Sequence, residues 1–100
     1  MADVNGKWAV QVATLAGARR YDLTLTTEGT ALAGTAVGPT GPVPIRNGSA
    51  VGDTIEFRLD LVAPVPMSLT FTLRVIGNEL TGTARSGPLP ASRVVGTRTA

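Results

Sequence analysis

The side chains that could do chemistry in this 100-residue chain are few, because it contains neither histidine nor cysteine. The absence of histidine removes the commonest general base and the commonest transition-metal ligand. The absence of cysteine excludes disulfides, thiol chemistry and cysteine-based zinc sites. Seven carboxylates, nine lysines and arginines, one tyrosine and the hydroxyl groups remain. The sequence has no nucleophile–base motif, no phosphate-binding glycine loop and no dense carboxylate cluster for a metal, so we expect no cofactor.

Asp53, Glu56 and Asp60 lie close together in the sequence, and Glu56 and Asp60 flank Arg58 at intervals of two residues. In a strand these three side chains share one face, and it is the face opposite Phe57 and Leu59. A carboxylate pair for acid–base catalysis needs an apolar environment that raises one of the two pKa values. We therefore expect a solvated ladder of charges on the outside and predict no catalytic residue.

Two further polar features have a structural and a functional interpretation. Tyr21 shares the parity of the apolar face, so its hydroxyl could hydrogen-bond a carbonyl ligand or lie in water at a rim. Asn47-Gly48-Ser49 matches a glycosylation sequon, but Asn-Gly is first of all a turn signal.

Strands must position these residues, because apolar and polar residues alternate in many short runs. The pattern predicts about eight strands and no long helix, at 8–13, 21–26, 31–37, 43–47, 55–61, 67–75, 79–85 and 92–98. Hairpin turns are expected at Glu28–Thr30 and Gly77–Asn78. A loop is expected over Gly48–Asp53. Proline interrupts pairing at Gly38–Pro42, Ala63–Pro66 and Gly87–Pro90, because it lacks the ladder donor.

The chain repeats itself with an offset of 48 residues. Residues 23–36 match residues 71–84 at seven of fourteen positions. The repeat predicts two four-stranded halves, 1–50 and 51–100, although convergent hairpin chemistry would produce a similar pattern. Each half alone would leave exposed strand edges, so the two halves should pair.

The predicted fold is therefore all-β: one domain forming an eight-stranded antiparallel up-and-down barrel. Gly34 and Gly82 should face inward, where they let a strand bend or let a large side chain such as Phe71 or Tyr21 cross over them. The remaining expected inward residues are Trp8, Val10, Val12, Leu23, Leu25, Leu32, Ile45, Ile55, Phe57, Leu59, Leu61, Leu69, Leu73, Val75 and Leu80.

Gly6 and Trp8 form a Gly-x-Trp pattern in the first strand, and Arg98 lies near the end of the last. These residues resemble the pattern of calycin barrels, the lipocalin- and avidin-like proteins. In lipocalins a late basic residue packs across the tryptophan at the closed end, so the resemblance implies that Trp8 and Arg98 plug one end. The alternative is that Trp8 is a platform on which a ligand stacks.

The chain is also similar, over most of its length, to a small bacterial all-β domain that occurs alone or appended to hydrolases. Lipocalins are longer and carry a C-terminal helix, and avidins line their site with several tryptophans, whereas this chain has one. The resemblance therefore implies a barrel and its plug, and it does not carry over a ligand.

Composition restricts the partners. The net charge of +2 comes from scattered residues, without the basic stripe and aromatic residues of a nucleic-acid-binding protein. No apolar run approaches the ~20 residues of a membrane span. The first residues lack the features of a signal peptide, so we expect a cytoplasmic protein, with a secreted mature chain from a longer precursor as the alternative.

Three functions remain open. The first is a small barrel that binds a small apolar molecule, for which the candidate ligand-binding residues are Trp8, Tyr21, Leu23, Leu25, Phe57, Leu59, Met67, Leu69, Phe71 and Leu73. The second is a cofactor-free lyase, isomerase or cyclase that acts on an apolar substrate in the barrel mouth. The third is a structural accessory domain with a filled core. Ala9, Ala13, Thr24 and Thr26 form flat, weakly charged faces, so a homodimer is plausible.

Overall fold

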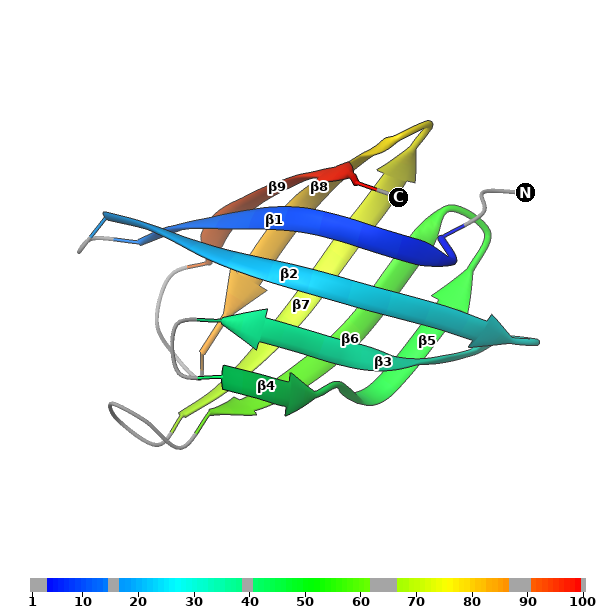
Figure 1. The fold of residues 1–100 in the computed structure, drawn as a ribbon, viewed down its shortest axis with the longest axis horizontal. Coiled ribbons are helices and arrows are strands. Elements are labelled where there is room, and N and C mark those ends of the chain that lie inside the picture. Colours follow the sequence, from blue (N-terminus) through cyan, green and yellow to red (C-terminus); the bar gives the residue numbers. More distant parts are fainter. Residues whose placement is uncertain (1–3, 15–16, 39–40, 62–66, 87–90, 100) are drawn as a thin grey trace.

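A computed structural model describes residues 4–14, 17–38, 41–61, 67–86 and 91–99, and these residues form strands joined by turns (Figure 1). The strands are β1 (Gly6–Thr14), β2 (Gly17–Glu28), β3 (Ala31–Gly38), β4 (Gly41–Pro44), β5 (Arg46–Val51), β6 (Thr54–Leu61), β7 (Met67–Ile76), β8 (Glu79–Arg85) and β9 (Ser92–Arg98). Within these ranges there is no helix long and apolar enough to cross a membrane.

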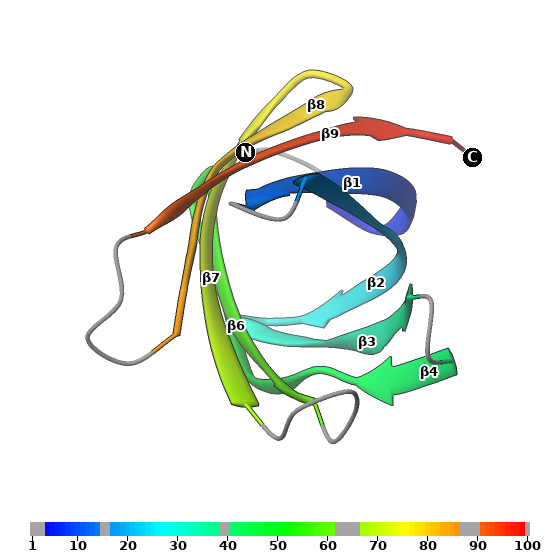
Figure 2. The same cartoon turned by 90° about the vertical axis from the view of Figure 1, so that its left-hand side faces the viewer.

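The strands form one sheet that closes on itself. Its order is β2-β1-β9-β8-β7-β6-β5-β3-β4, and β2 also pairs with β3. Every pairing is antiparallel. β4 and β5 both pair with β3 and together form one interrupted strand, so the predicted eight-stranded up-and-down barrel is confirmed. β1 to β4 lie across β6 to β9, with the core between the two layers (Figures 1 and 2).

The fourth predicted strand and the loop after it differ from the expectation. The strand expected at 43–47 is two strands, β4 and β5, separated at Ile45. The loop expected over Gly48–Asp53 was wrong, because β5 continues to Val51 and the turn occupies only Gly52 and Asp53. Asn47-Gly48 lies at a β-bulge, where the register with β6 shifts and Asn47 has a φ of 51°. The Asn-Gly pair thus bends a strand here.

The two hairpins β2–β3 and β7–β8 share one register with the predicted offset of 48 residues. Leu25 pairs with Gly34 as Leu73 pairs with Gly82, and the next strands continue the match. Leu32 pairs with Gly48, and Leu80 pairs with Gly96. Both a duplicated chain and two convergent hairpins would have this register, so duplication stays a prediction.

The core consists of the inward faces of the strands, as the alternation predicts. Of the seventeen inward side chains expected, all but three are buried: Ile45 and Leu69 are half-buried, and the side chain of Leu61 lies outside the described set. Val4, Ala36, Ala84 and Val94 complete the core, and among the described residues no charged or polar side chain is buried.

Gly34 and Gly82 are needed where neighbouring backbones come close together. A Cβ on Gly34 would lie 1.9 Å from the carbonyl oxygen of Thr24, and one on Gly82 would lie 2.0 Å from that of Thr72. The expectation that Phe71 or Tyr21 crosses one of these two glycines was therefore wrong, because strand backbone occupies the space. Tyr21 instead packs against Gly38, where a Cβ would lie 2.6 Å from its ring.

Trp8 and Arg98 close one end of the barrel, as the calycin resemblance implies. They are directly opposite each other in the β1–β9 ladder, and the guanidinium carbon lies 4.2 Å from the centre of the indole ring. The indole Nε1 donates to the carbonyl of Val4 at 2.9 Å. Arg98 donates to the carbonyl of Asn5 at 2.7 Å and to the side-chain oxygen of Asn78 at 3.1 Å. The arginine thus links the first strand, the last strand and the β7–β8 turn.

Replacing Arg98 tests this closure. Arg98→Ala removes a cation–π contact and charged hydrogen bonds, so we expect the free energy of unfolding to fall by about 1–3 kcal/mol. Urea unfolding measures the change. The free energy of unfolding of Arg98→Lys should lie between those of the wild type and Arg98→Ala, because an ammonium group keeps the charge but lacks the planar array of N–H donors. The control is Arg93→Ala, an exposed arginine of the same strand, and an equal loss in both variants would contradict the proposed plug.

Replacing Gly82 tests the close approach of β7 and β8. Gly82→Ala forces the two backbones apart, and overpacking of this kind costs about 1–3 kcal/mol. In a domain of this size that corresponds to a melting temperature lower by roughly 5–20 °C, measured by circular dichroism. Thr83→Ala, at the exposed neighbouring position, should change the melting temperature little. An unchanged melting temperature for Gly82→Ala would show that the two strands can separate without cost.

Candidate functional site

The predicted ligand-binding residues are divided between the two ends of the barrel. Trp8, Leu25 and Leu73 lie toward the end closed by Arg98. Tyr21, Leu59 and Leu69 lie toward the opposite end, where β2 and β7 begin and β6 ends. Leu23, Phe57 and Phe71 lie between them. The backbone of Met67 pairs with Leu61 at the opposite end, and its side chain lies outside the described set.

The middle of the barrel is packed with side chains. Trp8, Leu25 and Leu59 are 0% exposed, and Phe57 is 1% exposed. A cavity that admits water would leave accessible surface on its lining, so no such cavity borders these four side chains. Phe57 and Phe71 face each other across the β6–β7 ladder and stack with ring centres 4.8 Å apart and planes inclined by 10°. The two stacked rings fill the middle of the barrel, about halfway between its two ends.

The ladder is interrupted at one place beside this core, between β4 and β6. β5 pairs with β6 from Val51 back to Arg46, but β4 pairs only with β3 among the described strands. The three residues at the end of β6 pair with β7 alone. We call this break the β4–β6 gap; it lies at the end opposite Trp8 and Arg98, where β4 is an outer strand of its layer (Figure 1).

Two prolines explain the β4–β6 gap. The backbone N–H of Ile45 donates to the carbonyl of Gly34 on β3 at 3.1 Å. Since N–H groups alternate in direction along a strand, those of residues 42 and 44 would point the other way, toward β6. Both positions are proline, which has no N–H to donate. β4 therefore pairs well on one side and has no donor on the other.

Half-buried hydrophobic side chains lie beside the gap. Val43 and Ile45 alternate with the exposed prolines and pack against the core, as does Leu69 on β7. Ile45 and Leu69 were expected to face inward, and Leu69 was a candidate ligand residue. Val43 and the gap itself were missed. The signal that could have identified them is the alternation of Pro42 and Pro44 within one strand, which is typical of an edge.

A polar cluster lies on the outer face beside the gap. Asp60 of β6 accepts hydrogen bonds from Arg58 at 3.0 Å and from Ser68 at 2.7 Å, and its other oxygen lies 3.7 Å from Arg46 of β5. The hydrogen bonds from Ser68 and Arg58 hold the pKa of Asp60 below its ordinary value of 3.8. The solvated outer ladder expected at Glu56, Arg58 and Asp60 is present. The cluster joins β6 to β5 and β7, the two strands with which β6 forms ladders.

Comparison with known proteins shows the fold. No family model matches the chain, and no curated protein matches it. Among solved structures, a fatty-acid-binding protein from Manduca sexta is similar, with a TM-score of 0.61 and 12% sequence identity. The match covers 95% of this chain and 99% of that protein. The likeness supports the predicted fold, an antiparallel β-barrel.

The Asp60 cluster leads to a pH-dependent prediction. A carboxyl group whose pKa is lowered on folding stabilises the folded state above its ordinary pKa, and this contribution is lost as the pH falls through the lowered value. We therefore expect the wild-type protein to lose more stability than Asp60→Asn between about pH 5 and pH 2, measured by urea unfolding. Glu56→Gln is the control, because it removes an exposed carboxylate from the same strand face. If wild type and Asp60→Asn lose equal stability as the pH falls, the contacts of Asp60 do not stabilise the folded state.

Proposed function

We propose that this protein binds a small apolar molecule at the end of its barrel opposite Trp8 and Arg98, beside the β4–β6 gap. The observation that carries the proposal is the gap itself: a hydrophobic core adjoins a break in an otherwise paired wall. Moving β4 away from β6 breaks no strand-pairing hydrogen bond between them. The core beside Val43 and Ile45 is therefore the part of the barrel that a ligand reaches at least cost.

The packing limits the size of the ligand. Trp8, Leu25 and Leu73 form a sealed floor, because they have almost no accessible surface. The ligand would occupy the part of the barrel between the β4–β6 gap and the Phe57–Phe71 stack. It would displace part of the packing around Leu59 and Leu69 and rest against the two stacked rings. Of the candidate residues, Tyr21, Phe57, Leu59, Leu69 and Phe71 are those we propose as contacts, and Met67 stays a candidate through its place at this end.

The charge distribution favours a neutral ligand. Among the described residues no charged side chain is buried, so the interior offers no counter-charge to a carboxylate. The guanidinium groups of Arg46 and Arg58, beside the gap, lie outside the core and already face Asp60. The structural relative binds fatty acids, by its name; it supports an apolar ligand here, and the uncharged interior favours a molecule without an acid group.

The remaining expectations stay proposals. A cofactor-free lyase or isomerase at the barrel mouth has no observation in the described residues that favours it over binding. The cytoplasmic location and the likeness to a bacterial domain appended to hydrolases rest on the sequence alone. The homodimer is argued separately below.

Binding of an uncharged fluorophore tests the proposal. Wild-type protein titrated with phenylnaphthylamine, a neutral apolar probe, should show saturable fluorescence enhancement and bind the anionic anilinonaphthalene sulfonate more weakly. Ile45→Trp places a large side chain beside the β4–β6 gap, so we expect the affinity for phenylnaphthylamine to fall at least about tenfold, or ~1.4 kcal/mol.

Val51→Trp is the matched control, because Val51 is 66% exposed at the far end of the same strand. It should bind the probe as the wild type does, and circular dichroism should show that both variants are folded. Absence of saturable binding to the wild-type protein, or equal losses in the two tryptophan variants, would contradict the site.

A further inference from the structure

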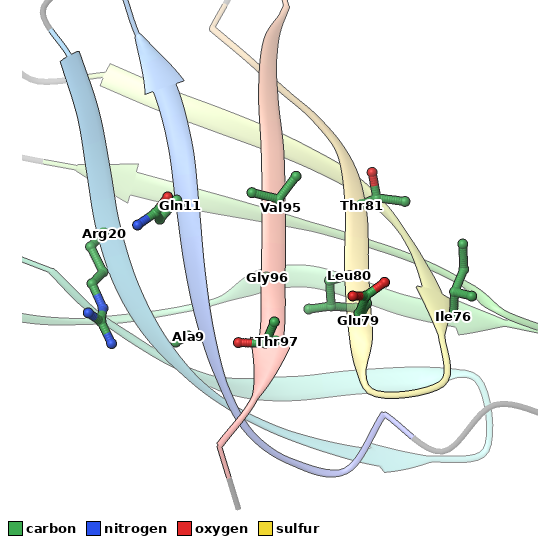
Figure 3. Close-up of a pocket in the computed structure, with 10 residues that line it drawn as sticks. All are labelled: Ala9, Gln11, Arg20, Ile76, Glu79, Leu80, Thr81, Val95, Gly96 and Thr97. Carbon is green, nitrogen blue, oxygen red and sulfur yellow. The ribbon is translucent and has the colours of Figure 1, made fainter.

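The outer surface of the barrel carries a groove that lies apart from the proposed ligand site. It runs over β1, β9 and β8 and has a volume of about 590 Å³ (Figure 3). Its lining includes the small residues Ala9 and Gly96. Apart from Leu80, which belongs to the core, the larger side chains around it are on the outer face of the sheet.

Two hydrophobic side chains of the groove are unusually exposed. Val95 is 44% exposed near its middle, and Ile76 is 55% exposed at one side. The described residues include only four large hydrophobics this exposed, so half of them belong to one groove. Exposed apolar side chains gathered in this way indicate a contact surface.

The groove has opposite charges on its two sides. Arg20 of β2 lies on one side and Glu79 of β8 on the other, with Val95 between them (Figure 3). β2 and β8 are separated by β1 and β9, that is, by three strand spacings or roughly 14 Å. They are too far apart to pair within one chain, and no ion pair joins either of them to another described residue.

We propose that the groove is a dimer interface occupied by a second copy of this chain. A two-fold axis lying in the sheet surface, passing close to Val95 and running roughly along β9, places Arg20 of one copy against Glu79 of the other. The symmetry repeats the contact in reverse, since each residue pair of such an interface occurs twice. Two ion pairs then flank a central contact between the two Val95 side chains.

A second copy of the chain complements the charges of the groove better than an unrelated partner that carries charge of one sign. A strongly acidic or basic partner would neutralise one side of the groove and be repelled by the other. A second copy matches both sides at once and covers Val95 and Ile76. The inference concerns a different face from the β4–β6 gap, so it goes beyond the proposed ligand function and does not depend on it.

Charge reversal and rescue test the dimer. Sedimentation velocity of the wild-type protein over a concentration series should show a reversible monomer–dimer equilibrium. Arg20→Glu and Glu79→Arg each create two like-charge contacts, so each should weaken the dimer by at least about tenfold. The double variant restores opposite charges and should return the dissociation constant to within about threefold of the wild type.

Val95→Asp tests the centre of the interface, because it brings two carboxylates together at the axis. It should abolish the dimer, whereas Val51→Asp, the same substitution at an exposed valine outside the groove, should leave it intact. The proposal is overturned if the wild-type protein is a monomer at every concentration, if Val95→Asp leaves the dimer unchanged, or if the double variant fails to restore it. Dissociation by Val51→Asp would likewise overturn it.

Discussion

The pairing of the first strand with the last is the constraint on which the rest of the structure depends. β1 pairs with β2 on one side and β9 on the other, so its position decides whether the sheet is a barrel or an open sheet with two edges. Trp8 and Arg98 hold this junction by stacking and by hydrogen bonds to the carbonyl of Asn5 and the side chain of Asn78.

The opposite end is weaker for a reason that is equally local. Pro42 and Pro44 leave β4 without the N–H groups that would face β6, so the wall there is held by side chains rather than by a ladder. The Asp60 cluster lies beside this break and joins β6 to β5 and β7 by charge-assisted contacts. Such contacts are more sensitive to pH and salt than a strand ladder. The barrel thus has one end held by Trp8 and Arg98 and, at the other, a break in its strand pairing.

The inside and outside of the barrel suit different roles. The inside is uncharged over the described residues and closely packed, which suits a small neutral ligand that enters beside β4. The outside carries the charges, and over β1, β9 and β8 they are arranged with opposite signs around exposed Val95. The two proposals therefore use different physical properties of one sheet, and each can fail while the other holds.

The sequence by itself determined most of the strands, their inward faces and the contact of Arg98 with Trp8. The reason is that alternation with a period of two depends only on neighbouring residues, and a closed sheet must bring its first and last strands together. The β4–β6 gap, the packed interior and the groove around Val95 were decided only by the tertiary structure. The direction of the missing N–H groups of Pro42 and Pro44 depends on which side of β4 pairs with β3. The distance that keeps Arg20 and Glu79 apart depends on the order of strands that are far from each other in the sequence.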